Sequence, residues 1–207
     1  MLIGLDFDNT LVRYDGVFHR LAVERGLIPA ELPASKHHIR EFLRAAGRED
    51  DWTQLQGLAY GPRITEAEPF PDVKRFLARC RAAGVRVVVV SHKTRFPYRG
   101  EPHDLHAATH RFLEWHGFLR TADTGLSAAD VFLELTLADK LRRIGQLGCT
   151  AFVDDLPEVL THPDFPPGVR KVLFDPAAAH PADRGYTRVS SWRACAAVLL
   201  AEREAVV

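Results

Sequence analysis

The stretch LIGLDFDNT, at residues 2–10, decides the fold. Residues 2–5 are apolar and predict a buried first strand, which ends directly on Asp6. Asp8 follows two positions later. Ligands of open parallel sheets bind outside the carboxyl ends of the strands. Asp6 and Asp8 are therefore predicted at a functional edge of a sheet.

Strand-like and helix-like segments alternate along the rest of the chain. The strongest strand is the valine run at 85–90, which is typical of a parallel strand covered on both faces. This alternation predicts an α/β fold, a doubly wound parallel sheet of Rossmann type with helices on both faces. Further strands are expected at 131–135, 151–153 and 171–174, and helices at 72–83, 104–116, 137–147 and 192–204.

Between residues 15 and 68 the sequence pattern changes: segments with helical spacing of apolar residues are separated by glycine and proline. Helices are expected near 17–25, 35–46 and 51–60. We interpret 15–68 as a small helical cap inserted after the first strand, and 1–14 with 69–207 as the α/β core.

The composition argues against several classes of function and location. The 207 residues contain 27 Lys and Arg against 27 Asp and Glu, and this zero net charge argues against a general nucleic-acid binder. No apolar run is long enough to span a bilayer, and the apolar residues before Asp6 are too few for a signal peptide. Cys80, Cys149 and Cys195 are expected to be buried thiols, so the cytoplasm is the expected compartment.

Polar residues stand at the end of three predicted strands. Besides Asp6 and Asp8, these are Ser91 and the pair Asp154 and Asp155. Clustered carboxylates repel one another unless a cation is present, and oxygen ligands of this kind suit Mg²⁺. We therefore predict a magnesium site at this edge.

Four motifs together resemble those of the haloacid dehalogenase-like (HAD) hydrolases. The first is DFDNTL at 6–11, the second is Ser91 after the valine run, the third is Lys140, and the fourth is FVDD at 152–155. They follow one another in the family order, and the resemblance spans about residues 1–175. It implies a phosphatase of this superfamily with a small helical cap.

The resemblance implies a role for each matching residue. Asp6 would be the nucleophile that takes the phosphoryl group, and Asp8 the general acid and base. Ser91 would bind a phosphoryl oxygen, and Lys140 would steady Asp6 and the transferring phosphate. Lys93 is an alternative source of this ammonium group. Asp8 also favours phosphoryl transfer, because dehalogenating relatives lack an acid there.

The metal ligands would be Asp6, Asp8 through its backbone carbonyl, Asp154 and Asp155. Which of Asp154 and Asp155 touches the metal is left open, since Glu158 stands where many relatives have a downstream aspartate. The remaining candidates for substrate binding are Asn9, Thr10, His92 and Lys93.

These features predict a Mg²⁺-dependent phosphohydrolase with an aspartyl-phosphate intermediate, acting on a small phosphorylated metabolite such as a sugar phosphate or nucleotide. The alternatives are a phosphomutase or phosphotransferase on the same fold, and a binding protein that keeps the fold without catalysis. Neither a membrane nor a nucleic acid is an expected partner, and the sequence leaves the oligomeric state open.

Two polar segments are open to either of two interpretations. The loop 92–99 carries three cations and two aromatic residues, and it is either solvated or a contact to an anionic or ring-bearing substrate. The segment 36–38 is a weaker candidate of the same kind. The histidines at 103, 106 and 110 share a helical face, but a solvated face is favoured over a zinc site.

The sequence also predicts the structural roles of three single residues. Asp72 is expected to help at a helix N-terminus and Gly84 to end that helix. Trp115 is expected in the core.

Overall fold

The computed structural model describes residues 1–181 and 185–204. The chain forms two compact units. One contains Met1–Leu11, Pro69–His92 and Gly117–Val207, and the other contains Val12–Glu68 and Lys93–His116. The second unit thus includes the segment 93–116 as well as the insert expected at 15–68.

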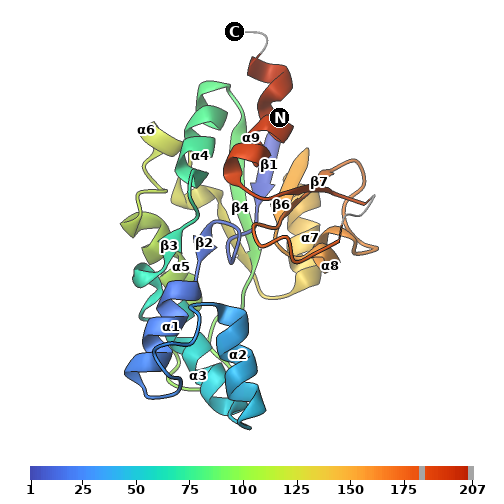
Figure 1. Ribbon diagram of the computed structural model, residues 1–207. Coiled ribbons are helices and arrows are strands. Elements are labelled where there is room, and N and C mark those ends of the chain that lie inside the picture. The colour runs from blue at the N-terminus through green and yellow to red at the C-terminus, as the bar shows by residue number, and fades with distance from the viewer. Residues whose placement is uncertain (182–184, 205–207) are drawn as a thin grey trace. The chain divides into compact units, whose positions relative to one another are not determined.

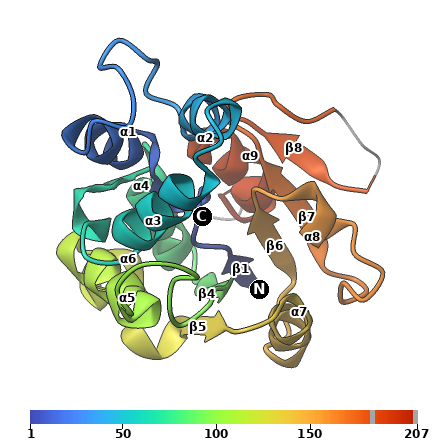
Figure 2. The same cartoon turned by 90° about the horizontal axis from the view of Figure 1, so that it is seen from below.

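The first unit is built on a six-stranded parallel sheet, which confirms the predicted α/β fold class. The strand order is β5-β4-β1-β6-β7-β8, and it can be followed in Figure 2. The strands are β1 (Leu2–Leu5), β4 (Arg86–His92), β5 (Val131–Glu134), β6 (Ala151–Asp154), β7 (Arg170–Phe174) and β8 (Thr187–Val189). A separate two-stranded sheet joins β2 (Val12–Arg13) to β3 (Glu68–Pro69).

Strand β1 lies between β4 and β6, so its apolar residues are covered on both sides. In this register Leu5 is opposite both Val89 and Val153. Gly4 is required by close packing, because a Cβ there would lie 2.5 Å from the ring of Phe152. This register brings Asp6, Ser91 and Asp154 to the same edge of the sheet.

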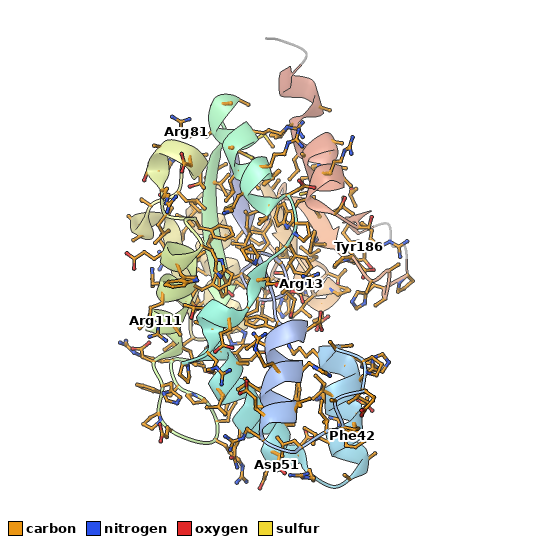
Figure 3. All side chains as sticks on the ribbon, turned by 60° about the vertical axis from the view of Figure 1, so that its left-hand side comes forward. Arg13, Phe42, Asp51, Arg81, Arg111 and Tyr186 are labelled. Carbon is orange, nitrogen blue, oxygen red and sulfur yellow. The ribbon has the colours of Figure 1, made fainter. Side chains whose placement is uncertain are left out.

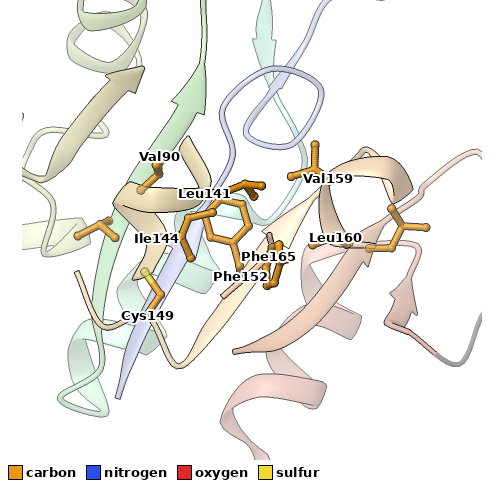
Figure 4. Close-up of a cluster of buried hydrophobic side chains, with 10 residues drawn as sticks. Val90, Leu141, Ile144, Cys149, Phe152, Val159, Leu160 and Phe165 are labelled. Atoms are coloured by element: carbon orange, nitrogen blue, oxygen red, sulfur yellow. The ribbon is translucent and has the colours of Figure 1, made fainter. Parts of the chain in front are cut away.

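Helices pack on both faces of the sheet (Figure 2). On one face, α7 (Leu137–Gln146) and α8 (Pro157–Leu160) cover Val88, Val90 and Phe152 in a buried cluster (Figure 4). Since side chains alternate along a strand, the neighbours of these residues point to the opposite face. On that face, α4 (Val73–Ala82) meets α9 (Trp192–Glu204), where the Phe76 and Trp192 rings are 4.9 Å apart.

The predicted helix at 72–83 is confirmed as α4, but the role expected for Asp72 is wrong. Its side chain makes no capping hydrogen bond, because its backbone is left-handed, with φ of 64°. Gly84, with φ of 66°, follows the C-terminal end of α4 as expected. Two short elements, α6 (Thr121–Thr124) and η2 (Ala128–Asp130), precede β5.

The second unit is helical (Figure 1). Its helices are α1 (Asp15–Glu24), α2 (Lys36–Ala45), α3 (Glu49–Tyr60), η1 (Ile64–Glu66) and α5 (Leu105–Trp115). These bounds confirm the helices expected in the insert. The stacked rings of Phe18 and Trp52, 4.9 Å apart, join α1 to α3.

Helix α5 and the loop before it pack on α3, which explains why 93–116 belongs to this unit. Arg111, labelled in Figure 3, donates from Nη2 to the carbonyl oxygen of Gly61 at 3.1 Å. A Cβ on Gly57 would lie 3.0 Å from Pro97, so the loop approaches α3 closely. Trp115 is 72% exposed, and its expected place in the core is therefore wrong. Trp115 is the last residue of α5 and lies beyond the buried part of this helix, which includes Leu105 and Phe112.

Cys80, Cys149 and Cys195 are buried free thiols, as expected. Within the described part of the chain, every helix is too short or too polar to cross a membrane.

Candidate active site

The site is centred on Asp6, which directly follows the central strand β1. The backbone N–H of Asp6 donates to the carbonyl oxygen of Val153 at 2.9 Å, so the strand pairing continues to this residue. Its carboxylate is almost fully buried. The Oδ1 atom accepts hydrogen bonds from Ser91 Oγ at 3.0 Å and from Lys140 Nζ at 2.6 Å. Two donors from separate elements thus fix the carboxylate of Asp6.

Lys140 reaches the site from the buried side of α7. The hydroxyl of Thr136 accepts from the backbone N–H of Asp139 at 3.1 Å and caps this helix. The ammonium of Lys140 also donates to Asp154 Oδ2 at 2.7 Å. Burial acts to lower the pKa of Lys140, but the carboxylates of Asp154 and Asp6 outweigh this effect, and the net pKa is raised. Lys140 is therefore a fixed positive charge between two carboxylates.

Asp6, Asp154 and Asp155 form a cluster in which one oxygen of each lies within 4.8 Å of the others. Burial raises the pKa of Asp154 to about 6, although Lys140 acts in the opposite direction. Burial, and then the charges of Asp6 and Asp154, raise the pKa of Asp155 well above its usual value. The cluster thus holds more negative charge than Lys140 alone can compensate.

Asn9 contacts this cluster from the loop after β1. Its Nδ2 donates to Asp155 Oδ2 at 3.2 Å, across 146 positions of sequence. The backbone of Asn9 is left-handed, with φ of 54°, a conformation that asparagine tolerates better than most residues. The structure therefore places Asn9 against a carboxylate of the cluster, an arrangement that the sequence alone did not predict.

Thr10, the next residue, is fully buried. Its carbonyl oxygen accepts a hydrogen bond from Trp192 Nε1 at 3.1 Å, which ties the loop to α9. The hydroxyl of Thr10 has no hydrogen-bond partner among residues 1–181 and 185–204. No sequence signal links Thr10 to Trp192, because the two are 182 positions apart.

The other predicted site residues are Asp8, His92 and Lys93. Asp8 is partly exposed on the loop after β1, and its side chain is not one of the three in the carboxylate cluster. His92 is exposed at the end of β4, and Lys93 belongs to the second unit. The histidines at 103, 106 and 110 form no metal-binding group in the described ranges. His106 instead pairs its Nε2 with the carbonyl oxygen of Lys93 at 2.8 Å.

The residues around Asp6 fit a divalent cation. With every group ionised, the three clustered carboxylates and Lys140 leave two uncompensated negative charges in a buried space. Carboxylate oxygens are the ligands that Mg²⁺ prefers. The raised pKa values of Asp154 and Asp155 show the cost of ionising this cluster without a cation.

Solved structures of known proteins share this architecture over almost the whole chain. One is a HAD family hydrolase from Deinococcus radiodurans R1 with bound phosphate and sodium, with 18% identity, coverage of 98% of this chain and 96% of that chain, and a TM-score of 0.57. Another is a dehalogenase with an intermediate complex, at 12% identity, 96% coverage of both chains and a TM-score of 0.59.

A third is the HAD-hydrolase YfnB from Bacillus subtilis bound to magnesium, at 9% identity, 96% coverage of this chain and 97% of that chain, and a TM-score of 0.54. The chain has the haloacid dehalogenase-like fold. No protein-family model matches the sequence, and no curated protein matches it.

Within the HAD-like fold, residues from the four motifs lie together. Ser91 and Lys140 contact Asp6, and Asp154 contacts Lys140. Solved proteins with this fold include a hydrolase with bound phosphate and a dehalogenase.

Proposed function

We propose that this protein is a Mg²⁺-dependent phosphomonoester hydrolase that acts through an aspartyl-phosphate at Asp6. The observation that carries the proposal is the buried carboxylate of Asp6, held by Ser91 and Lys140 beside two further carboxylates. A fixed, desolvated carboxylate is a suitable nucleophile toward phosphorus when cations neutralise the approaching phosphate.

In the first step, an oxygen of Asp6 attacks phosphorus and the bond to the leaving-group oxygen breaks. Asp8 gives a proton to that oxygen, so the product leaves as an alcohol. Lys140 and Ser91 would donate to phosphoryl oxygens as negative charge builds up on them, and their hydrogen bonds to Asp6 support this role.

In the second step, the deprotonated Asp8 takes a proton from water, and the water oxygen attacks phosphorus. The acyl-phosphate bond breaks, phosphate leaves, and the carboxylate of Asp6 is regenerated. Asp8 thus ends the cycle protonated, ready for the next leaving group.

The residues proposed to hold Mg²⁺ are Asp6, the backbone carbonyl of Asp8, and Asp155 or Asp154. When bound, the ion would offset the negative charge between phosphate and carboxylates. The contacts favour Asp155 as the direct ligand. Both oxygens of Asp154 are already engaged, one by Lys140 and the other by the backbone N–H of Leu156 at 3.0 Å.

We further propose that the helical second unit is the cap that selects substrates, and that these are small phosphorylated metabolites. The reaction class has two competitors. Dehalogenation is the activity for which two structural neighbours are named, and Asp8 argues against it here. Transfer of the phosphoryl group to a second substrate would use the same Asp6 intermediate.

The test is phosphate release from a panel of phosphorylated metabolites with Mg²⁺ by the wild type, Asp6→Asn and the control Asp123→Asn. Asp123 is an exposed carboxylate on α6, so its substitution should leave the rate unchanged. Asp6→Asn should abolish release while circular dichroism stays native, because an amide is a poor nucleophile.

Undiminished release by Asp6→Asn would overturn the mechanism. Halide release from 2-chloropropionate, without phosphate release, would establish a dehalogenase instead. Phosphoryl transfer to a second metabolite at a higher rate than to water would establish a transferase.

A further inference from the structure

In the first unit, a pocket of about 280 Å³ is lined by residues of α4 and α9. The two helices lie side by side (Figure 1). Phe76 and Trp192 form the aromatic part of the pocket, and Asp72, directly before α4, also lines it. The residues that contact Asp6, in contrast, belong to β4 and α7. The pocket is therefore separate from the candidate active site, although both lie in the same unit.

Four of the seven residues that line this pocket are charged, and three of the four are arginines. Arg75 and Arg79 are one helical turn apart on α4, and Arg193 lies on α9. Arg75 and Arg193 are exposed, and neither forms an ion pair with the side chains that the structure describes. Arg79 is not counted here, because it has another interaction. Even so, two guanidinium groups against the single carboxylate of Asp72 give the pocket a net positive charge.

The contact between the two aromatic rings fixes the backbone from which these guanidinium groups extend. Arg75 directly precedes Phe76, and Arg193 directly follows Trp192. Both rings are only 1% exposed, with centroids 4.9 Å apart, and Trp192 Nε1 donates to the carbonyl oxygen of Thr10 at 3.1 Å. Two guanidinium groups from neighbouring helices suit a phosphate group, whose oxygens accept paired hydrogen bonds from arginine.

Asp72 indicates what else the ligand contains. Its backbone is left-handed, with φ of 64°, and its side chain is not used to cap α4. A carboxylate repels a phosphate, but it accepts hydrogen bonds from hydroxyl groups. The volume is close to the lower limit of small-molecule pockets, about 300 Å³, so there is room for more than a phosphate ion. A phosphate joined to a chain or ring of hydroxyl groups meets all of these features.

We propose that this pocket binds a phosphorylated polyol, such as a sugar phosphate. Arg75 and Arg193 hold its phosphate group, and Asp72 accepts a hydrogen bond from one of its hydroxyl groups. The inference is independent of the proposed reaction at Asp6, because binding in this pocket involves no turnover.

The test follows the indole N–H resonance of Trp192 by NMR while glucose 6-phosphate is added. Trp52 and Trp115, the other two tryptophans, belong to the second unit and serve as internal references. Trp192→Phe identifies the resonance. We expect a saturable shift of this resonance alone. Glucose 6-phosphate should bind more tightly than glucose or inorganic phosphate, because each of these has only one of the two recognised groups.

The titration is done with EDTA, because without a cation the carboxylates around Asp6 repel a phosphate. Arg75→Met and Arg193→Met each remove one guanidinium group. Each should weaken binding about 10-fold, the low end for a charged hydrogen bond, because both residues are exposed. The matched control is Arg81→Met, which removes an exposed arginine of α4 that does not line the pocket (Figure 3). It should bind like the wild type.

Asp72→Gly tests the contact to the hydroxyl group, since glycine keeps the positive φ while the carboxylate is removed. It should reduce the preference for glucose 6-phosphate over inorganic phosphate. Equal affinity of the wild type for these two compounds would overturn the assignment of a polyol.

Two results would overturn the site itself. One is the absence of a saturable shift at Trp192 with glucose 6-phosphate. The other is unchanged binding in both Arg75→Met and Arg193→Met, which would mean that the ligand binds at another position. Neither result bears on phosphate release at Asp6, which is measured separately.

Discussion

At the scale of single residues, Asn9 combines a left-handed backbone with a contact to Asp155. A residue that orients a metal ligand raises metal affinity without touching the metal. Asn9→Gly would keep the backbone conformation and remove the donor, since glycine adopts positive φ freely. We expect Mg²⁺ affinity to fall about 10- to 100-fold, as is usual for such contacts, measured by titration calorimetry.

The control for this prediction is Asp123→Asn, which should bind Mg²⁺ like the wild type. If Asn9→Gly also binds Mg²⁺ with wild-type affinity, the Asn9 contact has no part in metal binding.

The residues around Asp6 were predictable from the sequence because each stands at the end of a strand or in a recognisable motif. Ser91 and Asp154 lie at the ends of strands that are otherwise mostly apolar, and the carboxyl ends of parallel strands meet at one edge of a sheet. The contact of Asn9 with Asp155, and the proximity of the arginines of α4 and α9, were not predictable. Such contacts depend on side-chain directions across long stretches of sequence, about which spacing carries no information.

At the scale of elements, β1 depends on the absence of a side chain at Gly4. Gly4→Ala would place a methyl group against the ring of Phe152, in the centre of the sheet. We expect destabilisation of about 1–3 kcal/mol, the usual cost of overpacking, measured by urea unfolding. The exposed Gly16, whose Cβ would meet nothing within 4 Å, is the control site, and Gly16→Ala should cost far less.

A second prediction at this scale concerns the link between η1 and α1. Arg63 donates from Nη2 to Glu66 Oε2 at 2.9 Å and from Nη1 to Glu24 Oε2 at 3.0 Å. The hydrogen bond from Arg63 lowers the pKa of Glu66 below its usual 4.5. The stability from this pair is therefore fully present above pH 4.5 and is lost as the pH falls through the lowered pKa.

Arg63→Met should thus destabilise the protein at pH 7, by about 1 kcal/mol or less for so exposed a pair, and less still at pH 3. Urea unfolding of both proteins at the two pH values measures the difference. A deficit of equal size at pH 3 would mean that packing of the Arg63 side chain, and not the ion pair, is responsible.

The long elements were predictable because their periodicity is strong, as in the valine run that forms β4. The three-residue edge strand β8 and the four-residue helix α8 are too short to show a period. Trp115 illustrates a different failure. An apolar residue at the end of a helical stripe looks buried, but it is covered only if another element packs on that last turn.

At the scale of the whole molecule, a ligand that binds only the folded state stabilises it. The carboxylate cluster exists only when β1 and β6 are paired, so Mg²⁺ should raise the unfolding temperature. At about 100 times its Kd, the gain should be about 2.7 kcal/mol. Thermal unfolding with Mg²⁺ and with EDTA measures it. Asp155→Asn should remove most of the gain, and an unchanged unfolding temperature in the wild type would contradict the metal site.

The grouping of 93–116 with the helical insert was not predictable from the order of elements. In sequence, this segment lies between two strands of the sheet, where a helix of the core is expected. The segment belongs to the helical unit because of contacts such as that of Arg111 with Gly61, two residues that are 50 positions apart.

The central position of β1 has a consequence for how the protein is made. β1 leaves the ribosome before both of its neighbours, which are β4, at residues 86–92, and β6, at residues 151–154. Both edges of β1 are therefore paired only after β6 has been synthesised, and until then one edge of this apolar strand has no partner. Nascent chains that stop short of β6 should be prone to aggregation, and their protection by chaperones should end when that strand emerges.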